Sequence, residues 1–356
     1  MKRLEEIYID FGISSFEKIE MTKLEKILGK GFSHDRFTKM LLNNELEDER
    51  DLWSKIKPLL RDYESIESGC IIIDDTILNK PYTKENEIVT WNFDHTVGKS
   101  VKSICMLNFH YTQEKRISIP LGYELITKSE IKYDEKKKKE VRKSLFSKNE
   151  IMRDKLEILT FHNEVVYRYI LADKWFASIE NMVFIDKILE KKFVFPLKKN
   201  RTIALTLEDK NKGNYVSIAV LDTEDCSSRL IYMKGSDRAF KLIKQVSKNR
   251  DDDESSYLYL LTNDIDLTHS EILEIYQRRW KVEEYHKSLK QNLKIEHSPT
   301  KVEISQRNHI FLSVCGFVKL EKLRLRYKMN HFALKEIIYI EALKSAYQKV
   351  EDLNSA

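Results

Sequence analysis

At the stretch GCIIIDDT, residues 69–76, the pattern of the sequence changes from helical to strand-like. This stretch is a short apolar run that ends in two acids, Asp74 and Asp75, and it follows a segment, residues 1–65, whose pattern is helical. An apolar run of this length between polar segments is typical of a buried β-strand. We therefore expect the helical segment to end here and an α/β domain to begin with a strand that carries acids at its end.

Further strands and helices alternate beyond this run. SVKSICMLNFHY (100–111) and RISIPLGYEL (116–125) resemble neighbouring strands, and residues 148–163 have a helical pattern. The run EVVYRYILAD (164–173) is again strand-like and ends in Asp173, before a helical stretch at 175–192 and the strand-like FVFPL at 193–197. This alternation predicts a mixed α/β sheet with helices on both faces.

The flanking segments differ in period from this core. Residues 1–65 contain MTKLEKIL, a GKG turn and a helix that Ser33 can cap, a pattern that fits either a DNA-binding helix-turn-helix or an ordinary helical hairpin. Short alternating stretches at 197–256 predict an all-β insertion, so the core is 66–196 together with 257–298. Residues 299–356 are expected to form a helical C-terminal segment.

Composition gives few further constraints. The 356 residues include 62 Lys+Arg against 57 Asp+Glu, and the net charge of +5 indicates an anionic partner only weakly. Four dispersed cysteines, without histidine or cysteine at metal-ligand spacing, argue for a reducing compartment and against a zinc site. No segment approaches the roughly 18 apolar residues of a membrane span, so we expect a cytoplasmic protein that has no membrane partner.

Two of the predicted strands end in aspartate, at Asp74/Asp75 and at Asp173. Strand ends in an open sheet are where reacting groups gather, because side chains there leave the packed layer. Two such carboxylates, joined by a third from a helix, can hold two magnesium ions about 3.5–4 Å apart for phosphodiester chemistry. The alternative for either position alone is a cap for the following helix.

A predicted helix at 268–293 carries the third acid in the stretch YQRRWKVEEYHKSLK, residues 276–290. At about 100° per residue, Tyr276, Arg279, Glu283 and Lys290 fall within an arc of roughly 60°. Glu283 can then be a metal ligand, with Arg279 and Lys290 binding phosphates beside it. The alternative is a solvated helix with i,i+4 pairs such as Glu283 with Lys287.

These residues also carry a resemblance. Tyr276, Arg279, Glu283 and Lys290 have the Tyr-x2-Arg-x3-Glu-x6-Lys spacing of the YREK signature of bacterial insertion-sequence transposases. Together with IIIDDTILNKPYT, YILADKWFAS and SHDRFTKML, the chain resembles the insertion sequence four family or the related seven-zero-one group. The resemblance implies a ribonuclease-H-like core with a DD-E triad. Its first acid is the Asp before Thr, Asp75, with Asp74 the less favoured reading, and Asp173 and Glu283 follow.

The same resemblance implies the chemistry and the partners. Two Mg2+ ions, or Mn2+ as a substitute, bound by Asp75, Asp173 and Glu283 would drive cleavage and strand transfer at terminal inverted repeats, in a homodimer bound to double-stranded end and target DNA. Tyr276, Arg279 and Lys290 would contact phosphates, possible neighbours of a flipped base. Lys287 and Trp280 are further DNA-contact candidates, with a core position as the alternative for Trp280. Where some relatives have a stacking tryptophan on the preceding strand, this chain has Tyr257 and Tyr259.

Other features have simpler interpretations. Trp91 and Trp175 are expected to pack in the core, and DEKKKKE (134–140) is expected to be a solvated loop. The basic stretch EKKFVFPLKKNR (190–201) either contacts a DNA backbone or makes no contact with DNA. An apolar face on residues 309–327 is a candidate for pairing two copies. The competing functions are a metal-dependent nuclease or recombinase without integration, and a non-catalytic DNA-binding protein.

Overall fold

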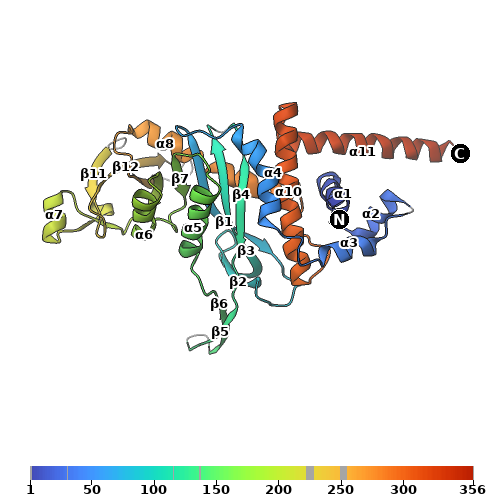
Figure 1. Cartoon of the computed structure of the whole chain (residues 1–356), viewed down its shortest axis with the longest axis horizontal. Coiled ribbons are helices and arrows are strands. Elements are labelled where there is room, and N and C mark those ends of the chain that lie inside the picture. The colour runs from blue at the N-terminus through green and yellow to red at the C-terminus, as the bar shows by residue number, and fades with distance from the viewer. Residues whose placement is uncertain are drawn as a thin grey trace.

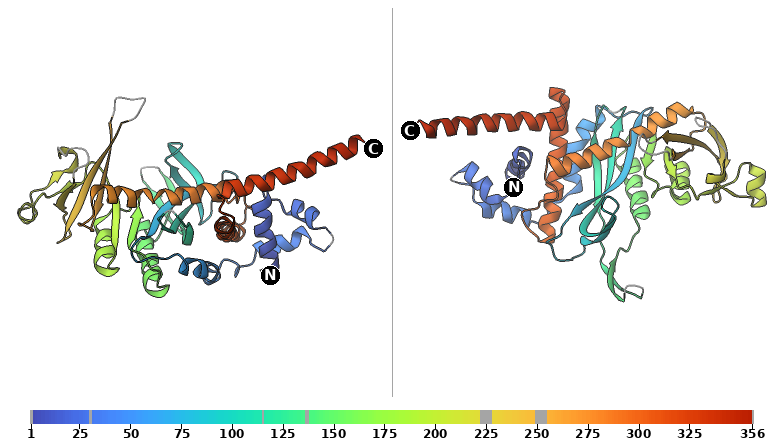
Figure 2. Two further views of the ribbon diagram at one scale, coloured as in Figure 1. Left: turned by 90° about the horizontal axis from the view of Figure 1, so that it is seen from above. Right: turned by 180° about the vertical axis from the view of Figure 1, so that it is seen from behind.

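The computed structural model describes residues 2–29, 31–114, 116–135, 138–221, 228–248 and 255–355. In this part of the chain, nine strands form one sheet in the order β11-β12-β13-β8-β7-β1-β3-β2, with β4 also paired to β3. Helices α5 and α6 lie on one side of the sheet and the α8–α9 helices on the other (Figures 1 and 2). The expected mixed α/β class is confirmed, and the arrangement is consistent with a ribonuclease-H-like core.

The centre of the sheet is built from the most apolar runs. β1 (Gly69–Asn79) pairs antiparallel with β3 (Lys99–Gln113) and parallel with β7 (Tyr169–Ala172), which in turn pairs parallel with β8 (Lys192–Leu197). The prediction that the first strand ends at its two acids was wrong, because β1 continues to Asn79 against the long β3. The neighbouring strand β7 does end beside these acids, because its last residue paired with β1 is Ala172, opposite Ile73.

The long β3 also carries both strands of the adjoining edge. β2 (Val89–Asp94) pairs with its first half and β4 (Ile119–Leu125) with its second half. A separate hairpin of β5 (Glu130–Asp134) and β6 (Lys139–Lys143) contains the ends of the predicted solvated loop, whose middle residues 136 and 137 lie outside the described residues.

The segment predicted as an all-β insertion extends the main sheet and includes a helix. β11 (Ser228–Tyr232) and β12 (Ala239–Lys248) continue the sheet through β13 (Ser255–Thr262), which pairs with β8. Before them come the short β9 (Thr202–Ile203) and β10 (Val216–Ser217), then η3 (Ile218–Val220). Helix α7 (Leu207–Lys212) forms because Thr206 caps its start and Gly213 ends it in the left-handed conformation. Residues 222–227 and 249–254 of the insertion lie outside the described part.

The helical termini follow the prediction in type. The N-terminal segment contains α1 (Lys2–Ser14), α2 (Met21–Leu28), α3 (His34–Leu41) and α4 (Glu49–Arg61), and the Ser33 hydroxyl accepts from Asp35 N at the start of α3 as expected. The C-terminal segment contains α10 (Glu303–Tyr327) and α11 (His331–Asn354). Figure 1 shows α11 extending away from the body of the molecule. No helix among the described residues is long and apolar enough to cross a membrane.

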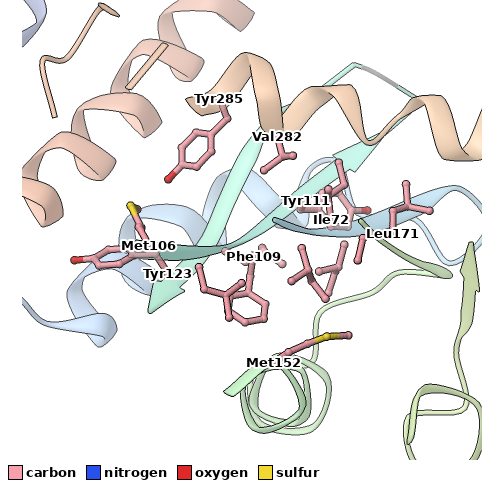
Figure 3. Close-up of a cluster of buried hydrophobic side chains, with 14 of the residues drawn as sticks. Ile72, Met106, Phe109, Tyr111, Tyr123, Met152, Leu171, Val282 and Tyr285 are labelled. Carbon is pink, nitrogen blue, oxygen red and sulfur yellow. The ribbon is translucent and has the colours of Figure 1, made fainter. Parts of the chain in front are cut away.

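Helices cover both faces of the core sheet. Figure 3 shows Val282 and Tyr285 on one side of the strands and Met152, from α5 (Lys148–Glu157), on the other. α5 runs on into the π-helical turn η1 (Ile158–His162), as α6 (Ile179–Val183) does into η2 (Phe184–Ile188). The side chains of Val282, Tyr285 and Met152 are fully buried. The carboxyl ends of the central strands therefore lie between two packed layers, where a side chain on either face meets a different set of neighbours.

The predicted long helix at 268–293 is interrupted. It consists of α8 (His269–Gln277) and α9 (Trp280–Gln291), joined at Arg278 and Arg279 by i→i+3 hydrogen bonds. The buried Arg278 guanidinium donates to Ser68 O at 2.8 Å and so ties this turn to the start of β1. The four motif residues are consequently divided between two helices and their junction.

Candidate active site

Asp74 and Asp75 point to opposite faces of the sheet, because successive side chains on a strand alternate. The Asp75 carboxylate faces α5, where Lys148 Nζ donates to its Oδ2 at 2.8 Å, and Cys105 Sγ lies 3.5 Å from the same oxygen. The Asp74 carboxylate faces the α8–α9 junction, 3.5 Å from Arg279 Nη1. Of the two adjacent acids, only Asp74 shares a face with the predicted helical motif.

Asp173 follows β7 directly, so it lies beside Asp74 at the level where β7 stops pairing with β1. Its Oδ1 accepts a hydrogen bond from Trp175 N at 2.8 Å, which fixes the carboxylate at the start of the loop after the strand. Its charge acts on both Asp74 and Tyr276. The alternative role of Asp173 as a cap is not seen, because α6 is capped by Ser178.

Arg279 joins the acids on this face. Its Nη2 donates to Glu283 Oε1 at 2.8 Å, and its Nη1 lies 3.5 Å from Asp74 Oδ2. The guanidinium is mostly buried, and its Nε is without a hydrogen-bond partner among the described residues. Glu283 is thus paired with Arg279 and not with Lys287, and Arg279 occupies the position of positive charge between two carboxylates.

The electrostatics of Asp74 are the most unusual feature of the site. Burial raises the pKa of its carboxyl from the ordinary value of 3.8 to about 7, the neighbouring Asp75 and Asp173 act in the same direction, and Arg279 acts against them. Functional sites frequently contain a carboxyl group whose pKa is raised by burial and by nearby negative charges. A divalent cation bound beside Asp74 would offset the repulsion between these carboxylates.

The donor chemistry suits magnesium. Carboxylate oxygens are the ligands that Mg2+ prefers. The partly buried Asp74 lies beside Asp173, and Arg279 links it to Glu283. Within the part of the chain that the structure describes, no three acid, histidine or cysteine side chains already converge as a complete metal site. The residues fit the ion in type, and the Arg279 guanidinium supplies compensating positive charge beside Asp74 and Glu283 here.

The other motif residues lie at different distances from this centre. The Tyr276 ring is 5.7 Å from Arg279 Cζ, so the two side chains are neighbours. Lys290 Nζ donates to Ile77 O at 2.8 Å, farther along β1. Lys287 is 5.0 Å from the Phe332 ring at the base of α11 and does not join the cluster.

Several aromatic side chains differ from expectation. Trp280 is 60% exposed, so its alternative core position is wrong, and the predicted packing of Trp91 and Trp175 is also wrong, since they are 54% and 59% exposed. On β13, Tyr257 is partly exposed while Tyr259 is buried, so only the Tyr257 ring is open to stacking. These rings lie on loops, edges and a helix junction, where the apolar side chain has no packed layer to enter.

Comparison with known proteins identifies the family of this chain. The chain matches the family described as DDE superfamily endonuclease over residues 18–204, and the family described as Transposase DDE domain over residues 147–316. The first match contains Asp74, Asp75 and Asp173, and the second contains Asp173 and Glu283. No curated protein matches the chain. The chain belongs to the DDE superfamily of endonucleases and transposases.

Proposed function

We propose that this protein is a DNA transposase that cleaves and joins DNA strands at the terminal inverted repeats of an insertion sequence. The observation that carries the proposal is the gathering of Asp74, Asp173, Arg279 and Glu283 at one face of the sheet, in a chain of the DDE superfamily. The YREK spacing and the insertion-sequence resemblance support the finer assignment to cut-and-paste transposition.

Asp74 is the better candidate than Asp75 for the first acid of the triad. Asp74 shares its face with Glu283 through Arg279, whereas Asp75 is held by Lys148 on the opposite face. In this assignment Asp74, Asp173 and Glu283 would hold Mg2+ or Mn2+. The metal, when bound, supplies an activated oxygen nucleophile and stabilises the departing oxygen.

The chain's own residues would position the DNA. A cation held by the acids would take over the charge compensation that Arg279 provides here, leaving its guanidinium available for a bidentate phosphate contact. The neighbouring Tyr276 and, farther along β1, Lys290 extend this polar surface. Trp280 is exposed beside Arg279, with its ring 5.8 Å from the guanidinium, and would lie against the same backbone.

The decisive experiment uses purified protein, Mg2+ and DNA that carries the element's own ends, beside a Glu283→Gln variant. We expect strand cleavage at the ends and joining to a target duplex, both lost in the variant, on denaturing gels. Cleavage without joined product would favour the nuclease or recombinase alternative. Binding without cleavage by the wild-type protein would contradict the enzyme proposal and favour a DNA-binding protein.

The proposed homodimer on DNA has a better candidate surface than the one expected from sequence. The prediction that an apolar face on residues 309–327 is free to pair two copies was wrong, because α10 is buried along most of its length against the body of the protein. In contrast, α11 has a stripe of exposed apolar residues at three- and four-residue spacing: Ile337, Ile340, Leu343, Tyr347 and Val350. Such a stripe is the pattern of a helix that packs against another helix.

A double variant, Leu343→Asp with Tyr347→Asp, will convert the DNA-bound dimer to a monomer. Charges placed in an apolar helix contact are strongly unfavourable, while on a solvated helix they cost little. Light scattering after size exclusion, with a duplex carrying the end sequence, measures the mass. The matched control is Ile27→Asp on α2, also an exposed apolar position. A dimer of unchanged mass in the double variant would contradict the α11 interface.

A further inference from the structure

Two exposed aromatic rings and two lysines lie at the end of the sheet next to the acid cluster. Trp175 follows β7 and is 59% exposed, and Tyr257 near the start of β13 is 41% exposed. Lys198 Nζ lies 5.8 Å from the centre of the Trp175 ring, and Lys199 Nζ lies 5.3 Å from the centre of the Tyr257 ring. Each ring therefore has an ammonium group beside it.

The backbone makes these four side chains one continuous strip. Lys198 and Lys199 are the two residues that follow β8, and the pairing of Leu197 with Tyr259 brings the start of β13 to the same end of the sheet. At the other end of the strip, Trp175 N donates to the Asp173 carboxylate. The strip thus runs from Tyr257 through the two lysines to Trp175 and reaches Asp173.

Within the described ranges, nothing shows that the strip stabilises the fold. The exposed faces of both rings add little to the core, and neither Lys198 nor Lys199 forms an ion pair with an acid in the described ranges. A pocket of about 380 Å³ opens beside Trp175, with Lys174, Lys198, Asn200 and Arg201 among its polar lining residues. Cations next to exposed rings, beside a polar hollow, form a surface that attracts phosphates and offers flat faces for stacking.

We propose that Trp175, Lys198, Lys199 and Tyr257 form a track that binds single-stranded DNA next to Asp173. Proteins that bind unpaired strands combine basic side chains for the backbone with aromatic rings for the bases. In a duplex each base face is already covered by its neighbours, so exposed rings favour an unpaired strand. The location of the track deepens the proposed function, because it would hold the strand beside the phosphate that reacts.

The test is a binding measurement that does not depend on cleavage. Fluorescence anisotropy with a labelled oligo(dT) strand, in EDTA, is compared with a duplex of the same length. Stacking contributes about 1–3 kcal/mol per base, so a Trp175→Ala/Tyr257→Ala variant should bind the single strand at least about tenfold more weakly. Its affinity for the duplex should change by less than about twofold, and a Trp175→Phe/Tyr257→Phe variant should restore single-strand binding.

Control variants separate this inference from the proposed function. Trp91→Ala/Phe93→Ala removes two exposed rings from β2, the edge strand that β1 and β3 separate from β7, and should leave single-strand affinity unchanged. Equal single-strand affinity in the Trp175/Tyr257 alanine variant and the wild type would overturn the track, as would an equal loss of duplex binding. If the wild-type protein fails to cleave end DNA while the Trp175/Tyr257 alanine variant still binds the single strand more weakly, the track stands and the transposase proposal fails.

Discussion

Replacing Asp74 by asparagine will reduce cleavage of end DNA by at least about 10³-fold, while Asp75→Asn will reduce it by about tenfold or less. A metal ion contributes several kcal/mol of transition-state stabilisation, and each 1.4 kcal/mol corresponds to a factor of ten in rate. Asp74 lies on the face with Arg279 and Glu283, whereas the Asp75 carboxylate is bound by Lys148 on the α5 face. Single-turnover cleavage rates at saturating Mg2+ measure the difference.

The two asparagine variants control for each other, since they are adjacent, isosteric and on the same strand. Circular dichroism and thermal unfolding should show that both retain the fold. A large loss in Asp75→Asn together with an active Asp74→Asn protein would reverse the assignment and return Asp75 to the triad. Equal, large losses in both would mean that the two faces of β1 act together.

The same Asp74→Asn substitution will stabilise the metal-free protein at neutral and alkaline pH. The pKa of Asp74 is raised by burial from 3.8 to about 7 in the folded chain, so the folded state binds the proton more tightly than the unfolded state. Its contribution to the free energy of unfolding is fully present below pH 3.8 and is lost as the pH rises toward about 7. Since one pKa unit corresponds to about 1.4 kcal/mol, the loss is on the order of 4 kcal/mol.

Urea unfolding in EDTA at a series of pH values measures this effect. The wild-type free energy of unfolding should fall between pH 3.8 and about pH 7 and then change no further with the ionisation of Asp74. The Asp74→Asn variant should lack this component of the pH dependence. Added Mg2+ should stabilise the wild type more than the variant above pH 7, because a bound cation favours the ionised carboxylate. Parallel pH profiles for the two proteins would contradict the raised pKa.

The position of Trp175 illustrates a signal that sequence reasoning passed over. It follows Asp173 by two residues, and a tryptophan so close to a predicted catalytic acid is as much a candidate for ligand contact as for the core. Periodicity favoured packing because the following residues are apolar and helical. The exposure of the ring depends on the loop that the Asp173–Trp175 hydrogen bond shapes, a contact that no apolar pattern encodes.

Features that depend on near neighbours along the chain could be predicted from the sequence. Apolar runs predicted β1, β3, β4 and β8, and the Ser33 cap predicted the start of α3. A strand end indicated Asp173 as a candidate, and motif spacing indicated Glu283 and the insertion-sequence resemblance. These signals are local, because strand and helix periods and caps depend on residues only a few positions apart.

Contacts between distant segments set which face of the sheet each acid occupies and which C-terminal helix is exposed. Alternation along β1 requires Asp74 and Asp75 to point apart, but the face that receives the motif depends on where α9 packs, more than 200 residues later in the chain. Likewise α10 and α11 both have apolar positions, and long-range packing against α1, α3 and α4 buries the first and leaves most of the second exposed. Contacts between distant segments set these outcomes, and a local pattern is compatible with either one.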